Sequence, residues 1–405
     1  MTQPILFNPF DPAYVANPHA FYARLRETAP VQQATLPDGQ ELWLLTRYAD
    51  VEAAFADPRL VKDPRNARSP EELARMPVRP EAMQYIQTIM LRRDPPDHTR
   101  LRRLVSKVFT PRMVEQLRSR VQAIADALLD AVADRGEMDL IDHYAFPLPI
   151  IVISEMLGVP ATDRDQFRRW SDVLMAAVVT PHPSGPAAVE AAEGFRRFME
   201  AQFEERHRAP AGDLITGLLQ AEEAGDKLSM EELLGMVYLL LVAGYETTAT
   251  LIGSGTLALL QHPDQLARLR GDVTLLPSAV EELLRFCSPV ALSHFRYAAE
   301  DIALRGVVIP KGAMVFAVIM AANRDPAWFP SPDTLDITRA DNRHFAFGHG
   351  IHYCLGAPLA RLEGEIALGT LLRRLPDLRL GVAPEALTWR PSLALRGLVK
   401  LPVAF

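Results

Sequence analysis

Apolar residues recur at helical spacing along most of the chain, whereas strand-like runs are short and lie near its two ends. Runs rich in Leu, Val and aromatic residues predict strands within 41–48, 307–320 and 398–405. The chain is therefore expected to be mainly α with smaller β-sheets. The predicted helices cover residues 17–28, 97–107, 111–135, 147–157, 162–178, 186–208, 229–260, 263–270, 278–286 and 355–374.

The segment 229–260 is the longest predicted helix. Ser229 and Glu232 are spaced as a capping box at its start, and it would be roughly 48 Å long at 1.5 Å per residue. Inside it, Gly244 weakens the helix by about 1 kcal/mol relative to alanine, and Glu246 places a carboxylate among apolar residues. A glycine packing contact beside a solvent-facing glutamate would explain this pattern, and so would a functional site.

Composition and charge narrow the class of protein. Hydrophobic residues make up 49% and charged residues 23% of the chain, which is typical of a soluble globular protein. The formal charge of −7 argues against a nucleic-acid binder. The most apolar uncharged run, 233–245, is shorter than the roughly 20 residues that a membrane span needs. With only two cysteines and no signal-like N-terminus, we expect a cytoplasmic protein.

No repeat or low-complexity linker divides the sequence, so residues 1–405 are expected to form a single domain. The segment TPHPSGP (180–186) interrupts two predicted helices. Its prolines and glycine cannot continue a helix, and they predict a loop there.

One of the two cysteines lies in the glycine-rich stretch FGHGIHYCLG (347–356). Cys354 directly precedes a predicted helix, and the positive end of a helix dipole favours a thiolate. Gly348, Gly350 and Gly356 allow unusual backbone angles and the close approach of a bulky planar group. The candidate roles of Cys354 are a catalytic thiol, a zinc ligand, for which the CxxC spacing is absent, and an axial haem thiolate.

The stretch resembles the cysteine-loop signature of the cytochrome P-450 superfamily, Phe-Gly-x-Gly-x-x-x-Cys-x-Gly, through Phe347, Gly348, Gly350, Cys354 and Gly356. The resemblance implies the cytochrome P-450 fold, with the long helix over haem b (iron protoporphyrin IX) and the cysteine loop beneath it. It also implies that Cys354 is the iron ligand. The chain is similar over essentially its whole length to bacterial soluble members that tailor macrolides and other secondary metabolites.

Other positions match the same family. Glu282-x-x-Arg285 and Arg339 correspond to a structural pair and its arginine partner, which brace the segment that carries the cysteine. The resemblance further implies that the haem propionates bind to four cationic or donor side chains. These are His98, Arg102, Arg296 and His352.

The odd segment of the long helix matches the oxygen-binding segment of the family through Ala243, Gly244, Glu246 and Thr247. By this resemblance, Gly244 leaves room for dioxygen, the Thr247 hydroxyl hydrogen-bonds to it, and Glu246 relays protons. Glu246 and Thr247 are therefore the expected catalytic residues.

The expected substrate pocket is mostly apolar, which predicts a hydrophobic small molecule held by few polar contacts. Macrolides, terpenoids or steroids, and fatty acids are all compatible with it. Leu239, Ala243 and Thr247 share one face of the long helix at i, i+4 and i+8. The other expected lining residues, from the resemblance, are Met90, Leu91, Ala291 and Leu292.

The resemblance implies a separate electron donor, a ferredoxin or flavodoxin with its NAD(P)H-dependent reductase. Arg100, Arg103, Lys107 and Arg112 form a basic cluster that could steer an acidic carrier, or could simply be a solvated helix face. We expect a monomer that binds neither nucleic acid nor membrane.

The leading functional hypothesis is a haem-thiolate monooxygenase that uses dioxygen to hydroxylate or epoxidise its substrate. One alternative is a peroxide-driven peroxygenase of the same fold, against which the pairing of Glu246 with Thr247 argues. The other is a haem-binding sensor without turnover, which would have no use for that pair.

Overall fold

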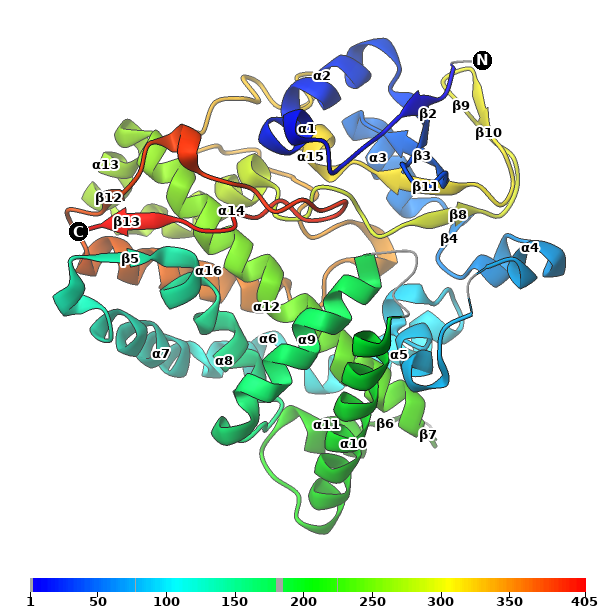
Figure 1. The fold of residues 1–405 in the computed structure, drawn as a ribbon, viewed down its shortest axis with the longest axis horizontal. Coiled ribbons are helices and arrows are strands. Elements are labelled where there is room, and N and C mark those ends of the chain that lie inside the picture. The colour runs from blue at the N-terminus through cyan, green and yellow to red at the C-terminus, as the bar shows by residue number, and fades with distance from the viewer. Residues whose placement is uncertain (1–2, 77, 180–184, 224) are drawn as a thin grey trace. The chain divides into compact units, whose positions relative to one another are not determined.

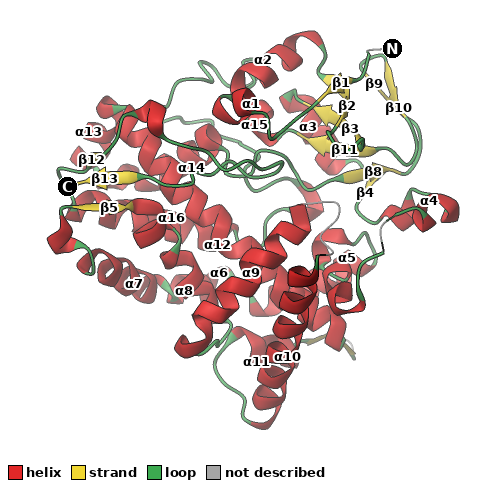
Figure 2. Cartoon of the chain, viewed as in Figure 1, coloured by secondary structure: helices red, strands yellow, loops and turns green. Residues whose placement is uncertain are grey.

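The computed structural model describes residues 3–76, 78–179, 185–223 and 225–405. Helices dominate this part of the chain and the strands are short (Figure 2), which confirms the predicted mainly α fold with smaller sheets. The chain forms two compact units. The first comprises Met1–Ser69, Gln122–Pro147 and Thr247–Phe405, and the second comprises Pro70–Val121 and Leu148–Glu246.

The first unit contains a sheet of the order β1-β2-β3-β11-β8-β4. Its N-terminal strands, blue in Figure 1, lie beside yellow strands from far along the sequence, because β3 pairs in parallel with β11 through Trp43 and Val315. The strands are β1 (Ile5–Leu6), β2 (Val31–Thr35), β3 (Glu41–Leu45), β4 (Leu60–Val61), β8 (Arg296–Ala298) and β11 (Met314–Ala317).

Strand β3 is apolar at consecutive positions because both of its faces are covered. Leu42 and Leu44 pack into one hydrophobic cluster of the first unit, and Trp43 and Leu45 pack into another. Successive side chains of a strand point to opposite faces, so a strand buried on both sides needs a continuous apolar run.

The first unit also contains smaller sheets and several helices. Helices α14 and α16 contribute Leu283 and Leu368 to a core that also includes Leu251. The smaller sheets pair β9 (Ile302–Leu304) with β10 (Val307–Ile309), and β12 (Arg379–Leu380) with β13 (Pro402–Ala404) and β5 (Glu137–Asp139). The helices are α1 (Pro12–Ala16), α2 (Pro18–Thr28), α3 (Tyr48–Ala56), α13 (Pro263–Gly271), α14 (Leu276–Cys287), α15 (Ile319–Ala322) and α16 (Ala357–Arg374).

The second unit is helical apart from the hairpin of β6 (Glu222–Glu223) and β7 (Asp226–Lys227). Its core is aromatic: the Phe195 ring stacks on Phe167 at 5.8 Å and on Tyr85 at 5.7 Å between ring centroids. The helices are α4 (Pro70–Ala74), α5 (Asp97–Val108), α6 (Pro111–Gln116), α9 (Arg164–Val179), α10 (Pro186–Arg208) and α11 (Leu214–Gln220). The division between the units falls within α7 (Arg118–Asp130), after Val121, and after the first residue of α8 (Pro147–Met156).

Helix α12 (Met230–Gln261) is the predicted long helix. Its capping box is present: the Ser229 backbone N–H donates to Glu232 Oε2 at 2.9 Å, and the Glu232 N–H donates to Ser229 Oγ at 3.3 Å. The helix is long and apolar enough to cross a membrane, but 67% of its most apolar window is buried, as in the core helix of a globular protein.

Several predicted boundaries are wrong for identifiable reasons. The predicted helix 111–135 is broken at Leu117 into α6 and α7. The predicted strand 41–48 ends at Leu45, because the Tyr48 N–H donates to Asp325 Oδ2 at 2.8 Å and begins the unpredicted helix α3. A turn at Gly312, whose φ is +78°, splits the run 307–320 into β10 and β11. Residues 180–184 of the predicted loop lie outside the described residues.

Candidate functional site

The cysteine loop folds back on itself in the first unit. The Cys354 N–H donates to the Phe347 carbonyl at 2.9 Å, which closes the loop. Gly348 and Gly350 have φ of +72° and +73°, a conformation that glycine adopts without strain. A Cβ on Gly350 would lie only 2.9 Å from the Phe55 carbonyl oxygen, so glycine is also required there for space. The loop thus presents the exposed Cys354 thiol just before the first turn of α16.

This arrangement fits a haem better than a zinc ion. Among the described residues, no group of three or more His, Cys, Asp or Glu side chains is placed to hold a metal. A single accessible thiolate suits a metal that brings its other ligands with it, as the iron of a haem does. Cys287, the other cysteine, is different: burial raises the pKa of its thiol to about 12, so it stays protonated.

Residues 239–247 of α12 carry a partly exposed stripe on an otherwise buried helix. Residues 233–238 and 248–252 are buried, whereas Leu239, Ala243 and Thr247 are partly or fully exposed. Gly244 and Glu246 are also half-buried. The structure therefore places the predicted oxygen-binding and lining residues of this helix on accessible surface.

Gly244 is not a close packing contact. A Cβ at Gly244 would lie 3.5 Å from Ile153 Cγ1, an ordinary van der Waals distance. By contrast, a Cβ at Gly235 of the same helix would meet the Tyr85 carbonyl oxygen at 2.7 Å. Close packing against a neighbour therefore does not explain why residue 244 is glycine. The space that a side chain would occupy there can instead serve a ligand.

The residues predicted for the propionates fall in both units. In the first unit, Arg296 begins β8 and is 4% exposed, and its Cζ lies 4.8 Å from the centre of the Phe55 ring. Because Gly350 also packs against Phe55, Arg296 and the cysteine loop share a neighbour. His352 lies in the 3-10 turn Gly350–His352 of the loop.

In the second unit, His98 and Arg102 lie one turn apart on α5. The His98 side chain is buried and the Arg102 side chain is half-buried, so this face of α5 points inward. Met90 and Leu91 lie in the short 3-10 turn Met90–Arg92 that precedes the helix.

The other two predicted lining residues are in the first unit. Ala291 and Leu292 are 5% and 0% exposed and pack into the hydrophobic cluster of the sheet. The Ala291 N–H donates to the Ala394 carbonyl at 2.7 Å, which ties this segment to residues near the C-terminus.

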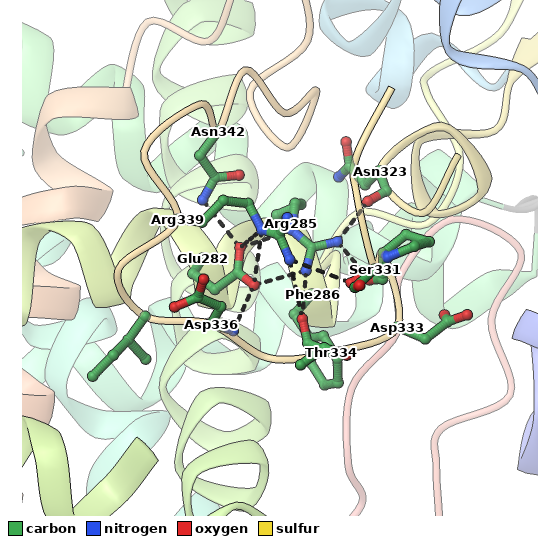
Figure 3. Close-up of polar contacts among 12 residues, drawn as sticks. Glu282, Arg285, Phe286, Asn323, Ser331, Asp333, Thr334, Asp336, Arg339 and Asn342 are labelled. Atoms are coloured by element: carbon green, nitrogen blue, oxygen red, sulfur yellow. Dashed lines mark hydrogen bonds and ion pairs between the residues drawn. The ribbon is translucent and has the colours of Figure 1, made fainter. Parts of the chain in front are cut away.

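Glu282, Arg285 and Arg339 converge in one buried cluster (Figure 3). Arg285 forms a two-pronged pair with Glu282, with both N···O distances 2.7 Å and both side chains 0% exposed. Arg339 Nε adds a contact to Glu282 Oε2 at 3.2 Å. The same carboxylate also accepts from the Asn342 side chain and the Asp336 N–H. Such a buried pair is stable only when every charge is satisfied, as it is here.

The cluster reaches the cysteine loop through Asn323. Arg285 Nη1 donates to the Asn323 carbonyl at 2.9 Å, and Asn323 Oδ1 accepts from the Phe345 N–H at 2.8 Å. Phe345 lies two residues before Phe347, so α14 holds the start of the loop through two hydrogen bonds.

The basic cluster, of which Arg100, Arg103 and Lys107 lie on α5 and Arg112 on α6, is not a uniformly solvated face. Arg100 forms ion pairs with Glu232 and Asp226, and Lys107 Nζ donates to the Glu222 carbonyl at 2.9 Å. Both side chains thus point to residues 222–232 of the same unit. Arg103 and Arg112 are exposed.

Sequence reasoning missed four residues near the site: Glu281, His344, Arg361 and Glu363. The first three form an ion-pair cluster beside the cysteine loop. Glu363 is fully buried on α16, and burial raises its pKa to about 8 against an opposing contact with Thr248. A Glu on the apolar face of a helix pattern is the one sequence signal that could have singled out Glu363.

Comparison with known proteins agrees with this geometry. The family model "Cytochrome P450", written here P-450, matches residues 164–376. Cytochrome P-450 107B1 of Saccharopolyspora erythraea is 50% identical over 396 residues, which cover 97% of this chain and 96% of that protein. The cytochrome P-450 monooxygenase PikC of Streptomyces venezuelae is 47% identical, over 96% of this chain and 91% of its own.

Solved structures agree as well. The Bacillus subtilis polyketide synthase cytochrome P-450 PksS superposes with a TM-score of 0.92 at 43% identity, over 98% of this chain and 99% of that one. Sequence and fold both match over nearly their full length. The chain belongs to the cytochrome P-450 family.

Proposed function

We propose that this chain is a haem-thiolate monooxygenase in which Cys354 binds the iron of haem b. Family membership identifies the chain as a cytochrome P-450 monooxygenase, for which a haem is implied. The observation that supports the ligand assignment is the accessible Cys354 thiol, held by a closed loop at the start of α16. A bound haem would supply the iron that activates dioxygen with two electrons.

The other site residues then have distinct roles. His98, Arg102, Arg296 and His352 would hold the two propionates of a bound haem. Gly348 and Gly356, with the Phe347 ring, would leave room for a bound porphyrin, and Gly350 lets the loop pack against Phe55.

Proton delivery is assigned to the exposed stripe of α12. Cleavage of the O–O bond needs protons, and the half-buried Glu246 carboxyl can carry them from solvent. The Thr247 hydroxyl, one residue on, would pass these protons on within the site, and Gly244 would leave space for dioxygen.

The proposed substrate is an apolar small molecule that is hydroxylated or epoxidised. Leu239, Ala243, Met90 and Leu91 offer a mostly apolar lining, together with Ala291 and Leu292. Relatives of this chain include a vitamin D(3) 25-hydroxylase, 6-deoxyerythronolide B hydroxylase and mycinamicin IV hydroxylase/epoxidase, and a cytochrome P-450 crystallised with myristic acid. These relatives support a role in secondary metabolism.

We further propose that electrons come from a separate ferredoxin or flavodoxin with its NAD(P)H-dependent reductase. The exposed Arg103 and Arg112 are the side chains of the basic cluster best placed to attract an acidic carrier. The chain would act as a cytoplasmic monomer in which both units form one catalytic domain, without nucleic-acid or membrane partners. The net charge of −7 argues against nucleic-acid partners.

The ligand assignment is tested by the reduced carbon monoxide spectrum. We expect the red-shifted Soret band of a thiolate-ligated haem, and its loss in Cys354→Ala. Cys287→Ala is the matched control and should keep the band, because that thiol is buried and protonated. A thiolate band that survives Cys354→Ala would overturn the assignment.

A further inference from the structure

A second ion-pair cluster, centred on Glu281, lies beside the cysteine loop. Glu281 of α14 forms a two-pronged pair with Arg361 of α16, with Arg361 Nε 2.7 Å from Oε1 and Nη2 2.8 Å from Oε2. The side chains are 29% and 34% exposed, so the pair is only partly screened by water. Burial raises the pKa of Glu281, but hydrogen bonds from Arg361 and His344 outweigh it and lower this pKa to about 2. The carboxyl is therefore ionised.

Arg361 contacts both ends of the cysteine loop. Its Cζ lies 4.5 Å from the centre of the Phe347 ring, and its Nη1 donates to the Tyr353 hydroxyl at 3.3 Å. Phe347 accepts the Cys354 N–H, and Tyr353 directly precedes Cys354. The guanidinium thus contacts one residue that is hydrogen-bonded to Cys354 and one that directly precedes it.

His344 completes the cluster from the chain that enters the loop. Its Nδ1 accepts from the Ala346 N–H at 3.2 Å, so Nδ1 carries no proton and the ring proton is on Nε2. Nε2 lies 3.3 Å from Glu281 Oε2, and the side chain is 3% exposed. Glu281 therefore ties together α14, α16 and the segment before the loop.

We propose that Glu281, Arg361, Tyr353 and His344 are positioning residues that set the reduction potential at Cys354. This inference rests on the proposed role of Cys354 as the haem ligand. The charges of Glu281 and Arg361 cancel while the pair is intact. Removing either one leaves the other uncompensated beside the thiolate, and a nearby positive charge favours the reduced state, which carries one more electron.

The two halves of one ion pair should therefore act in opposite directions. Redox titration of the haem-loaded protein is the measurement. At a fixed ambient potential, we expect Glu281→Gln to raise the ratio of reduced to oxidised haem several-fold and Arg361→Gln to lower it several-fold. If the cluster only braced the loop, both substitutions would change the ratio of reduced to oxidised haem in the same direction. Tyr353→Phe, which changes no charge, should give a smaller shift than either.

Arg374 at the end of α16 offers a matched control. It pairs with Asp130 and Asp126, so Arg374→Gln removes the same charge from the same helix. We expect its reduced-to-oxidised ratio to equal that of the unmodified protein. Equal shifts from Arg374→Gln and Arg361→Gln, or shifts of one sign from the Glu281 and Arg361 variants, would overturn the proposal.

If the glutamine variants do not bind haem, their redox titration cannot be measured, and Arg361→Lys then tests the proposal. It retains the charge but not the two-pronged geometry, so we expect bound haem with an unchanged ratio. Loss of haem in this variant too would show that packing alone matters and would contradict the electrostatic role. A wrong ligand assignment would appear separately, as a thiolate band that survives Cys354→Ala.

Discussion

At the scale of single residues, position separates groups of the same chemistry. Cys354 is exposed, whereas Cys287 is partly buried and its thiol donates to the Ser254 carbonyl, although both are thiols next to helix ends. Thr247 and Thr256 both lie on α12, but Thr247 is half-buried whereas the Thr256 hydroxyl is buried and donates to the Ile252 carbonyl at 2.7 Å. Only the accessible member of each pair is available to a ligand.

The Thr247 hydroxyl provides a test of dioxygen use against peroxide use. We expect Thr247→Ala to lower dioxygen-driven product formation by about 10²-fold, the usual range for a lost proton-transfer group. Peroxide-driven product formation should change little. Thr256→Ala is the control and should keep both rates. Unchanged dioxygen-driven turnover in Thr247→Ala would contradict the proton-delivery role, whereas turnover of the unmodified protein with peroxide but not with dioxygen would favour the peroxygenase alternative.

Glu363 makes stability depend on pH. Its pKa rises from 4.5 to about 8 in the folded chain because the carboxyl is buried. Between these values the folded state holds a proton that the unfolded state has released, so stability falls as pH rises, by about 1.4 kcal/mol per unit. We expect Glu363→Gln to match the unmodified protein in urea unfolding at pH 5. At pH 8 it should be more stable by several kcal/mol. If the difference in unfolding free energy between Glu363→Gln and the unmodified protein were the same at pH 5 and pH 8, this carboxyl would not titrate as assigned.

At the scale of elements, α12 uses glycine for two purposes. Gly235 allows close approach of the segment that contains Tyr85 and Thr88, whose oxygens would lie 2.6–2.7 Å from an added Cβ. Gly244 has no such neighbour, and it lies in the partly exposed stripe. One glycine serves packing, and the other leaves accessible space.

Alanine substitution should separate these purposes. We expect Gly235→Ala to cost about 1–3 kcal/mol of stability, because a backbone carbonyl cannot move aside cheaply. Gly244→Ala should leave stability unchanged or slightly higher, since alanine favours the helix, yet lower dioxygen-driven turnover. Urea unfolding and turnover assays compare the two variants directly. Equal destabilisation by both would contradict the distinction.

At the scale of the whole molecule, local patterns predicted the helices well and long-range contacts poorly. Helical periodicity placed 186–208 and 229–260 within a residue of α10 and α12, because each helix has a continuous buried face. The parallel pairing of β3 with β11 leaves no local signal in the sequence. Neither does the start of α3, which is fixed by the hydrogen bond that the Tyr48 N–H donates to Asp325.

In the candidate site too, local contacts could be predicted from the sequence and long-range contacts could not. Glu282 and Arg285 are three residues apart, so their pairing follows from helix geometry. The Glu281–Arg361 pair spans 80 residues, and the contacts between Arg100 and Glu232 span 132. Spacing along the sequence cannot reveal such contacts, which is why the cluster of Glu281, His344 and Arg361 beside the cysteine loop was missed.

The central sheet has a consequence for the order in which the chain can fold. Strand β3 needs β11 as a neighbour, and the paired residues Trp43 and Val315 are 315 − 43 = 272 positions apart. At a synthesis rate of about 5–20 residues per second, β3 emerges from the ribosome roughly 14–54 s before its partner. The edge of β3 that pairs with β11 is free for that interval. The nascent chain must therefore keep an apolar strand from associating with other chains until β11, in the last quarter of the sequence, has been made.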